Sequence, residues 1–74
     1  MRKHTIESEV TGNVWKVLKS AGEAVSEGEV IIILESMKME IPVEASCAGV
    51  ITQMLVSEEE QVEEDQALAI IESA

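Results

Sequence analysis

The sequence predicts an all-β fold, either a sandwich or a barrel, and three observations lead to this fold class. Two similar halves follow each other at an offset of 37 residues, so that Gly12 matches Gly49. Each half contains short aliphatic runs rich in Val and Ile, which are typical of strands. Glycines and polar residues bound these runs. The matched pairs include Leu18/Leu55, Ser20/Ser57, Glu23/Glu60, Val25/Val62, Glu27/Glu64, Ile33/Ile70, Glu35/Glu72 and Ser36/Ser73.

The first half, at about residues 11–36, predicts two strands separated by a turn region. An apolar alternating stretch at residues 10–18 predicts the first strand, and the aliphatic run at 30–34 predicts the second. Between them, residues 19–29 are mostly polar and include two glycines, which are typical of turns. The half therefore has the order strand, turn region, strand.

The second half, at about residues 48–73, repeats this order with strands predicted at 50–56 and 67–71. Residues 57–64 have helical propensity but lack an apolar stripe, so we predict a loop with at most one helical turn. Pro42 has no N–H to donate to a sheet, which predicts an edge strand or a strand with a break at 41–43. If the halves pack about an approximate two-fold axis, Met37 corresponds to Ala74. The junction between the halves and the end of the chain should then lie well apart.

Length and composition predict a single domain, residues 1–74, with an aliphatic core. Hydrophobic residues make up 46% of the chain, and Trp15, the one aromatic residue, is expected in the core. Burial of apolar surface contributes roughly 25 cal/mol per Å², which offsets chain entropy only if both halves pack together. One half alone should not fold. The single cysteine, Cys47, excludes an internal disulfide.

The charge of the chain argues against nucleic acid as a partner. Fifteen acidic residues against five basic ones give a formal net charge of −10, which phosphates and anionic membranes would repel. The longest apolar run is too short to span a membrane, and no signal peptide is evident, so we expect a cytoplasmic protein. No linker rich in Pro and Ala or in Gly and Ser is evident, which favours a free-standing polypeptide. The acidic runs at 58–60 and 63–65 predict a solvated face with no metal site, and His4 is expected in a tail.

The junction between the halves carries the motif Leu-Glu-Ser-Met-Lys-Met-Glu-Ile at residues 34–41, with a hairpin expected at 37–38. Strand alternation would place Met37 and Met39 on one face, and Lys38 and Ser36 on the other. Two flexible thioethers would then form an apolar collar, and the lysine ammonium would point into water. The motif predicts a lysine that accepts a covalently attached cofactor.

Residues 35–40 resemble the attachment signature of biotinyl domains, the family of the biotin carboxyl carrier proteins, and the similarity extends over about residues 10–72. The chain also resembles the small stand-alone biotin/lipoyl attachment proteins. The resemblance implies a flattened barrel of two four-stranded antiparallel sheets, with the lysine at a hairpin tip. The implied site consists of Lys38 as acceptor, Met37 and Met39 for recognition by the ligase, and Glu35 and Ser36 as motif flank.

The implied function is that of a non-catalytic, monomeric carrier. A biotin protein ligase would attach biotin to Lys38, and the carrier would move carboxyl groups between a biotin carboxylase and a carboxyltransferase. A lipoyl carrier of the 2-oxoacid dehydrogenase type, or an acceptor of both biotin and lipoate, is the alternative, although Met on both sides of the lysine differs from the Asp-Lys-Ala typical of lipoyl domains. An unmodified interaction module is a third hypothesis. Glu59 and Asp65 stand where the family often has glycine, so the backbone near Glu59 is where this chain departs most from the pattern.

Overall fold

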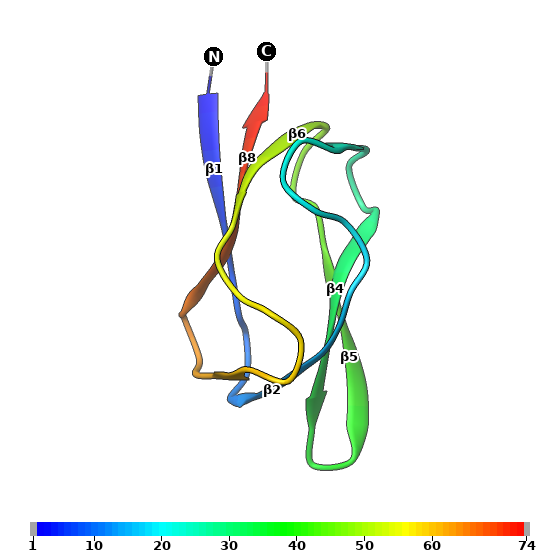
Figure 1. Ribbon diagram of the computed structural model, residues 1–74, viewed down its shortest axis with the longest axis vertical. Helices are drawn as coiled ribbons and strands as arrows, with labels where there is room; N and C mark the ends of the chain where they lie inside the picture. Colours follow the sequence, from blue (N-terminus) through cyan, green and yellow to red (C-terminus); the bar gives the residue numbers. More distant parts are fainter. Residues whose placement is uncertain (1, 74) are drawn as a thin grey trace.

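The computed structural model describes residues 2–73, which form two four-stranded antiparallel sheets (Figure 1). One sheet has the strand order β1-β8-β6-β3 and the other β5-β4-β2-β7. Within the described residues there is no helix, and hence no helix that could cross a membrane. The all-β fold class is confirmed. The strands are β1 (Arg2–Glu7), β2 (Gly12–Val17), β3 (Ala24–Val25), β4 (Val30–Ser36), β5 (Met39–Glu44), β6 (Gly49–Met54), β7 (Gln61–Val62) and β8 (Ala67–Ser73).

The approximate two-fold symmetry is confirmed, because every strand has a counterpart at the offset of 37 residues. β2 corresponds to β6, β3 to β7, β4 to β8 and β1 to β5, with the same lengths in each pair. The symmetry exchanges the two sheets, and each sheet contains strands from both halves: β1 pairs with β8, and β2 pairs with β7. A single half therefore cannot complete either sheet.

The symmetry places the β4–β5 hairpin at one end of a molecule whose backbone measures 36 × 17 × 17 Å. In Figure 1 the hairpin projects at the bottom, whereas β1 begins and β8 ends at the top. Ala74, the residue that the repeat pairs with Met37, lies outside the described residues. Pro42 lies in β5, an edge strand as predicted, where its missing N–H leaves no gap in the ladder.

Strand β1 was missed by the sequence reasoning, which placed His4 in a tail. His4 pairs with Ile71 of β8, and its Nε2 atom lies 3.1 Å from Ser73 Oγ. The repeat carried the signal for this strand, because Ile6 and Glu7 match residues 43 and 44 at the same offset. Charged residues at the start of the strand hide the alternation, since β1 is an edge strand with most side chains exposed.

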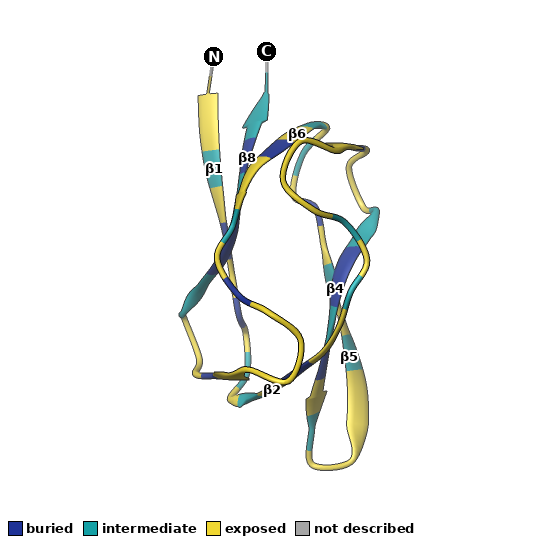
Figure 2. Cartoon of the chain, viewed as in Figure 1, coloured by how far each residue is buried: buried dark blue, intermediate teal, exposed yellow. Residues whose placement is uncertain are grey.

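The core is aliphatic and lies between the two sheets, as the dark segments of Figure 2 show. Its largest fully buried apolar side chains come from both halves: Val14, Ile31, Ile32, Leu34, Ile51, Val62, Leu68 and Ile71. The placement of Trp15 in the core was wrong, because its side chain is 43% exposed. The β2–β4 register shifts between Val14 and Lys16, and this bulge turns the Trp15 ring to the outer surface.

Four similar turns connect the short strands to their neighbours. In each turn, the first residue donates its backbone N–H to the side chain of the fourth, and the fourth donates its N–H to the carbonyl of the first. The turns span residues 20–23, 26–29, 57–60 and 63–66. The third residue has positive φ each time, as a type II turn requires: Gly22, Gly28, Glu59 and Asp65. Residues 57–64 form a loop with the short strand β7 and no helical turn.

Candidate attachment site

The candidate site is the tight turn between β4 and β5. Ser36 and Met39 are the last cross-strand pair, so Met37 and Lys38 form a two-residue loop. Their φ angles are 52° and 64°, and positive values at both positions are what a type I′ turn requires. Such turns usually hold Asn or Gly, because other residues lose about 1–2 kcal/mol each in this region. The turn fixes the register of the hairpin and presents Lys38 at its tip.

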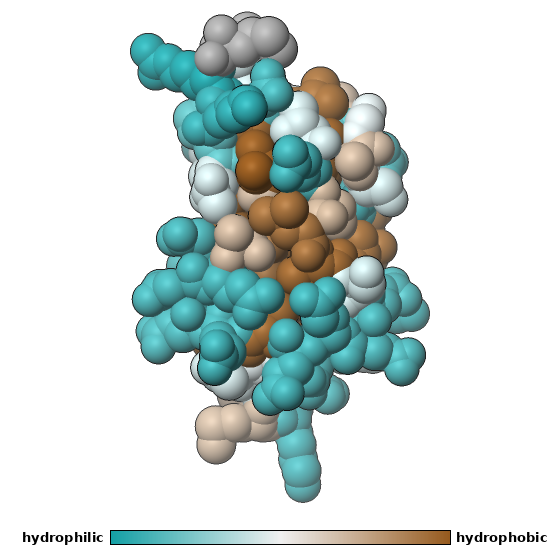
Figure 3. Space-filling view, turned by 60° about the vertical axis from the view of Figure 1, so that its left-hand side comes forward, coloured by the Kyte–Doolittle hydropathy of each residue, from teal (hydrophilic) through white to brown (hydrophobic). Residues whose placement is uncertain are grey.

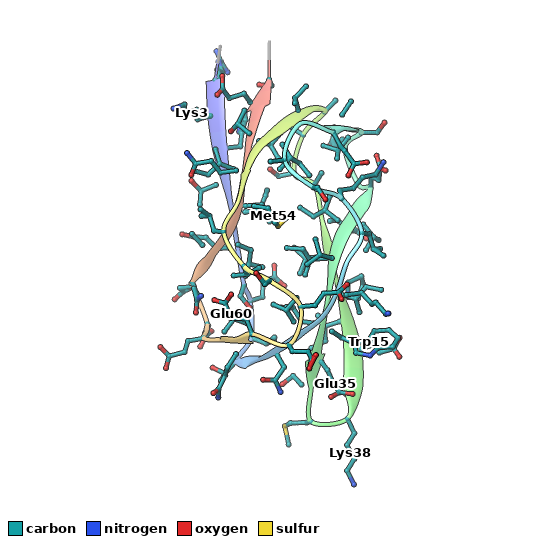
Figure 4. The ribbon with its side chains drawn as sticks, viewed as in Figure 1. Lys3, Trp15, Glu35, Lys38, Met54 and Glu60 are labelled. Carbon is teal, nitrogen blue, oxygen red and sulfur yellow. The ribbon has the colours of Figure 1, made fainter. Side chains whose placement is uncertain are left out.

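The tip is open to solvent. Met37 is 91% exposed and Met39 is 64% exposed. Lys38 is exposed as well, and Figure 4 shows its side chain extending away from the body of the molecule. The ion pair found among residues 2–73 joins Lys19 to Glu29, so no described carboxylate holds the Lys38 ammonium. An enzyme can reach the Lys38 Nζ atom from several directions.

The predicted alternation of side chains around the tip was wrong. It placed Met39 and Ser36 on opposite faces, whereas these residues lie directly opposite each other in the ladder and therefore share a face. Met37 and Lys38 lie in the turn, where the two-residue period of a strand no longer applies. The prediction failed because it treated residues 36–39 as one continuous strand.

The base of the hairpin is fixed to the neighbouring strand. The Ser36 hydroxyl donates a hydrogen bond of 2.9 Å to the Thr11 carbonyl. At Gly12, a Cβ atom would clash with the Glu35 backbone oxygen, so the glycine allows β2 and β4 to approach closely. Asn13 pairs with Glu35 in the ladder. Glu35 and Ser36, the predicted motif flank, thus belong to the fixed base, and the turn extends beyond it.

Carboxylates surround this end of the molecule. Glu35 and Glu40 lie directly opposite each other on the hairpin. The loop at 57–66 packs against the start of β2, since the Glu59 N–H donates to the Val14 carbonyl over 2.7 Å. Hydrophilic side chains cover most of this end in Figure 3. Within residues 2–73, no group of His, Cys, Asp or Glu side chains is suited to hold a metal ion, and the acidic surface is solvated.

Comparison with known families gives a match over residues 4–71 to the family described as "Biotin-requiring enzyme", the biotin/lipoyl model. The chain is 36% identical over 66 residues to the "Biotinylated protein TB7.3 homolog" of Mycobacterium leprae, covering 89% of this chain and 93% of that protein. It is 39% identical over 64 residues to the "Biotin/lipoyl attachment protein" of Bacillus subtilis, covering 86% of this chain and 88% of that protein.

Among solved structures, the fold is similar to part of the urea carboxylase of Kluyveromyces lactis, with a TM-score of 0.89 and 32% sequence identity. The similarity covers 96% of this chain and only 6% of the carboxylase chain. The matched family model covers nearly all of the strands described above, including both strands of the hairpin. The chain belongs to the biotin/lipoyl attachment family and is a carrier domain of that family.

Proposed function

We propose that Lys38 is the attachment site of biotin, and that the chain carries carboxyl groups between the active sites of a biotin carboxylase and a carboxyltransferase. The observation that carries this proposal is the exposed, unpaired Lys38 at the tip of the projecting hairpin, with Met37 and Met39 on either side. The names of the similar proteins support biotin as the cofactor.

The residues of the turn fit an amide-linked cofactor. A biotin protein ligase would present biotin as an activated acyl phosphate: the deprotonated Lys38 Nζ atom attacks the carboxyl carbon, the phosphate group leaves, and loss of a further proton gives a neutral amide in place of the ammonium. The unbranched thioethers of Met37 and Met39 offer adaptable apolar contacts to the ligase. Glu35 and Ser36 keep the base of the hairpin in place, so that the acceptor amine stands clear of the sheets.

The attached ring system supplies a nitrogen that takes up and releases a carboxyl group, and the domain supplies the tether. Tethering keeps the group at an effective concentration of about millimolar near both active sites, provided that the arm can span them. The proposed partners are therefore the ligase, the carboxylase and the transferase. We further propose that the carrier is a monomer in the cytoplasm.

Lipoate is the alternative cofactor, alone or together with biotin. The name of the similar Bacillus subtilis protein includes both groups. An exposed lysine on a type I′ turn suits either amide, because the acceptor amine stands open to solvent. Methionine on both sides of Lys38 favours biotin over lipoate.

Intact-mass measurement tests the proposal after co-expression of the chain with a biotin ligase or with a lipoate ligase. We expect one biotinyl group per chain in the wild type. Lys38→Arg should abolish the adduct, whereas Lys16→Arg, a change at another exposed lysine, should leave it intact. A lipoyl adduct alone would support the alternative. A chain that gains neither group would contradict the carrier function.

A further inference from the structure

Trp15 lies on the surface beside the hairpin, although no feature of the core or of the turn requires it there. It is the only aromatic residue of the chain, and its side chain is 43% exposed. Lys16 Nζ lies 5.6 Å from the centre of the ring, a cation–π distance that restrains the indole. The two-fold counterpart of Trp15 is Thr52, so the repeat does not account for an aromatic side chain at this position.

The exposed ring lines a shallow cleft of about 330 Å³. The lining residues are Asn13, Val14, Trp15, Glu35 and Glu59. Three separate features of the fold bring them together: the β2–β4 ladder, the bulge in β2, and the hydrogen bond from the Glu59 N–H to the Val14 carbonyl. The volume is at the low end of the range of about 300–1,000 Å³ that is usual for small-molecule sites.

The chemistry of the cleft suits a small apolar ring that carries N–H donors and a carbonyl. The indole offers an apolar face of large area. The Glu35 and Glu59 carboxylates can accept hydrogen bonds, and the Asn13 amide can donate one to a carbonyl oxygen. A cyclic urea fused to a sulfur-containing ring, the head group of biotin, has these features. A dithiolane ring, the head group of lipoate, has no N–H to donate.

The cleft lies within reach of a group attached to the hairpin tip. Glu35 is three residues from Lys38, and the turn lies between them, so their Cα atoms are at most about 11 Å apart. The arm between the Lys38 Cα atom and a biotinyl ring contains about ten single bonds of about 1.5 Å, which allows an extension on the order of 12 Å. Figure 4 shows Trp15 and Glu35 in the half of the molecule that carries the hairpin.

We propose that this cleft is a resting site for the biotinyl ring attached to Lys38, with Trp15 against the ring and Glu35 accepting from its N–H groups. The inference rests on the proposed function, because an unattached ring would bind too weakly to stay. With an effective concentration of about 1 mM, a contact with a Kd of about 1 mM is occupied about half of the time. The ring is thereby sheltered between transfers and released readily.

The single tryptophan makes the proposal testable by fluorescence, since no other aromatic residue contributes to the emission. Acrylamide quenching is measured on the protein before and after complete biotinylation, with intact mass confirming one adduct. The neutral quencher does not respond to the charge lost at Lys38. Half occupancy of the cleft should lower the quenching constant about 1.5- to 2-fold. In Glu35→Ala protein that intact mass shows to carry the adduct, the quenching constant should return most of the way to its value before biotinylation.

A matched control moves the indole to the equivalent position in the other sheet. In the double variant Trp15→Thr/Thr52→Trp, the new side chain replaces an exposed residue of β6, in the sheet that lacks the hairpin. Biotinylation of this variant should leave the quenching constant unchanged. A complete adduct on the wild-type chain with unchanged quenching would overturn the resting site and leave the proposed function standing. Absence of the adduct would overturn both.

Discussion

At the scale of single residues, the chain tolerates backbone conformations that its side chains disfavour. Within residues 2–73, four non-glycine residues have positive φ: the two of the hairpin turn, Met37 and Lys38, and the two turn residues Glu59 and Asp65. In the first half, glycines occupy the positions equivalent to the last two. The first pair presents the lysine, and Glu59 lines the proposed cleft, whereas nothing in the structure explains why Asp65 stands in place of glycine. These two turns therefore offer sites for stabilisation.

Glu59→Gly should stabilise the fold by about 1 kcal/mol. The substitution removes a left-handed penalty of about 1–2 kcal/mol and adds about 0.5–1 kcal/mol of backbone entropy loss. In a domain of this size, the thermal midpoint should rise by roughly 4–8 °C. Glu64→Gly is the matched control, because Glu64 lies in an equivalent turn without positive φ and should lose stability. A lower midpoint for Glu59→Gly would contradict the turn assignment.

Glu29 should make the free energy of unfolding depend on pH in the acidic range. The Ser26 backbone N–H, 2.9 Å away, and the Lys19 ammonium, at 3.1 Å, lower the pKa of its carboxyl below the ordinary value of 4.5. Because its pKa is lowered in the folded protein, the Glu29 carboxylate adds to the free energy of unfolding above pH 4.5. This contribution is lost as the pH falls through the folded-state pKa. The equivalent turn has Gln66, which accepts the same type of hydrogen bond but does not titrate.

Glu29→Gln places the same residue type at this position as Gln66 in the turn at 63–66. The variant should lose the pH dependence of stability that comes from Glu29. Urea unfolding at pH 7 and pH 3 measures the effect. Between these two values, the wild type should lose more stability than the variant, because only the wild type has a carboxylate at this position. Equal losses in the two proteins would show that the Glu29 contacts do not contribute in solution.

At the scale of elements, the β4–β5 hairpin has a base that is fixed to its neighbours and a tip that projects beyond them. Ser36 and Glu35 are held by a hydrogen bond to Thr11 and by the ladder with β2, whereas Met39 pairs only with Ser36 of the same hairpin and the turn lies beyond that pair. The element could be predicted from the repeat and the motif, because both point to a bend at residues 37–38. The face on which each side chain lies could not be predicted, because it depends on how many residues form the turn.

Met39→Ala should slow biotinylation without loss of the fold. The Met39 side chain is 64% exposed, so its removal takes little from the core, while the ligase loses an adaptable apolar contact. The initial rate of labelling is measured beside the thermal midpoint. Val50→Ala, at an exposed apolar residue of β6, is the control and should be labelled at the wild-type rate. Unchanged labelling of Met39→Ala would count against a recognition role.

Strand β1 and Trp15 show where sequence patterns were insufficient. An edge strand buries few side chains, so β1 shows little periodicity, and only comparison with β5 through the repeat reveals it. Trp15 was expected in the core because aromatic side chains usually bury large areas. The bulge in β2 determines its exposure, and a bulge inserts a residue without a marked change in sequence pattern.

At the scale of the whole molecule, the two halves depend on each other. Since each sheet takes strands from both halves, fragments 1–37 and 38–74 should each lack stable β-structure. Circular dichroism and amide exchange of the separate fragments check this expectation. A fragment that shows a cooperative thermal transition by itself would contradict it. The fold class and the symmetry were predictable from sequence because the repeat spans both halves.

The central claim is that the fold presents one particular amine for acylation. Tandem mass spectrometry of the chain after limited exposure to biotin ligase maps the modified residue directly. The geometry of the turn predicts that the biotinyl group is found on Lys38, with Lys3, Lys16 and Lys19 unmodified. A biotinyl group distributed over several lysines, or located on another one, would contradict the claim that the hairpin tip is the attachment site.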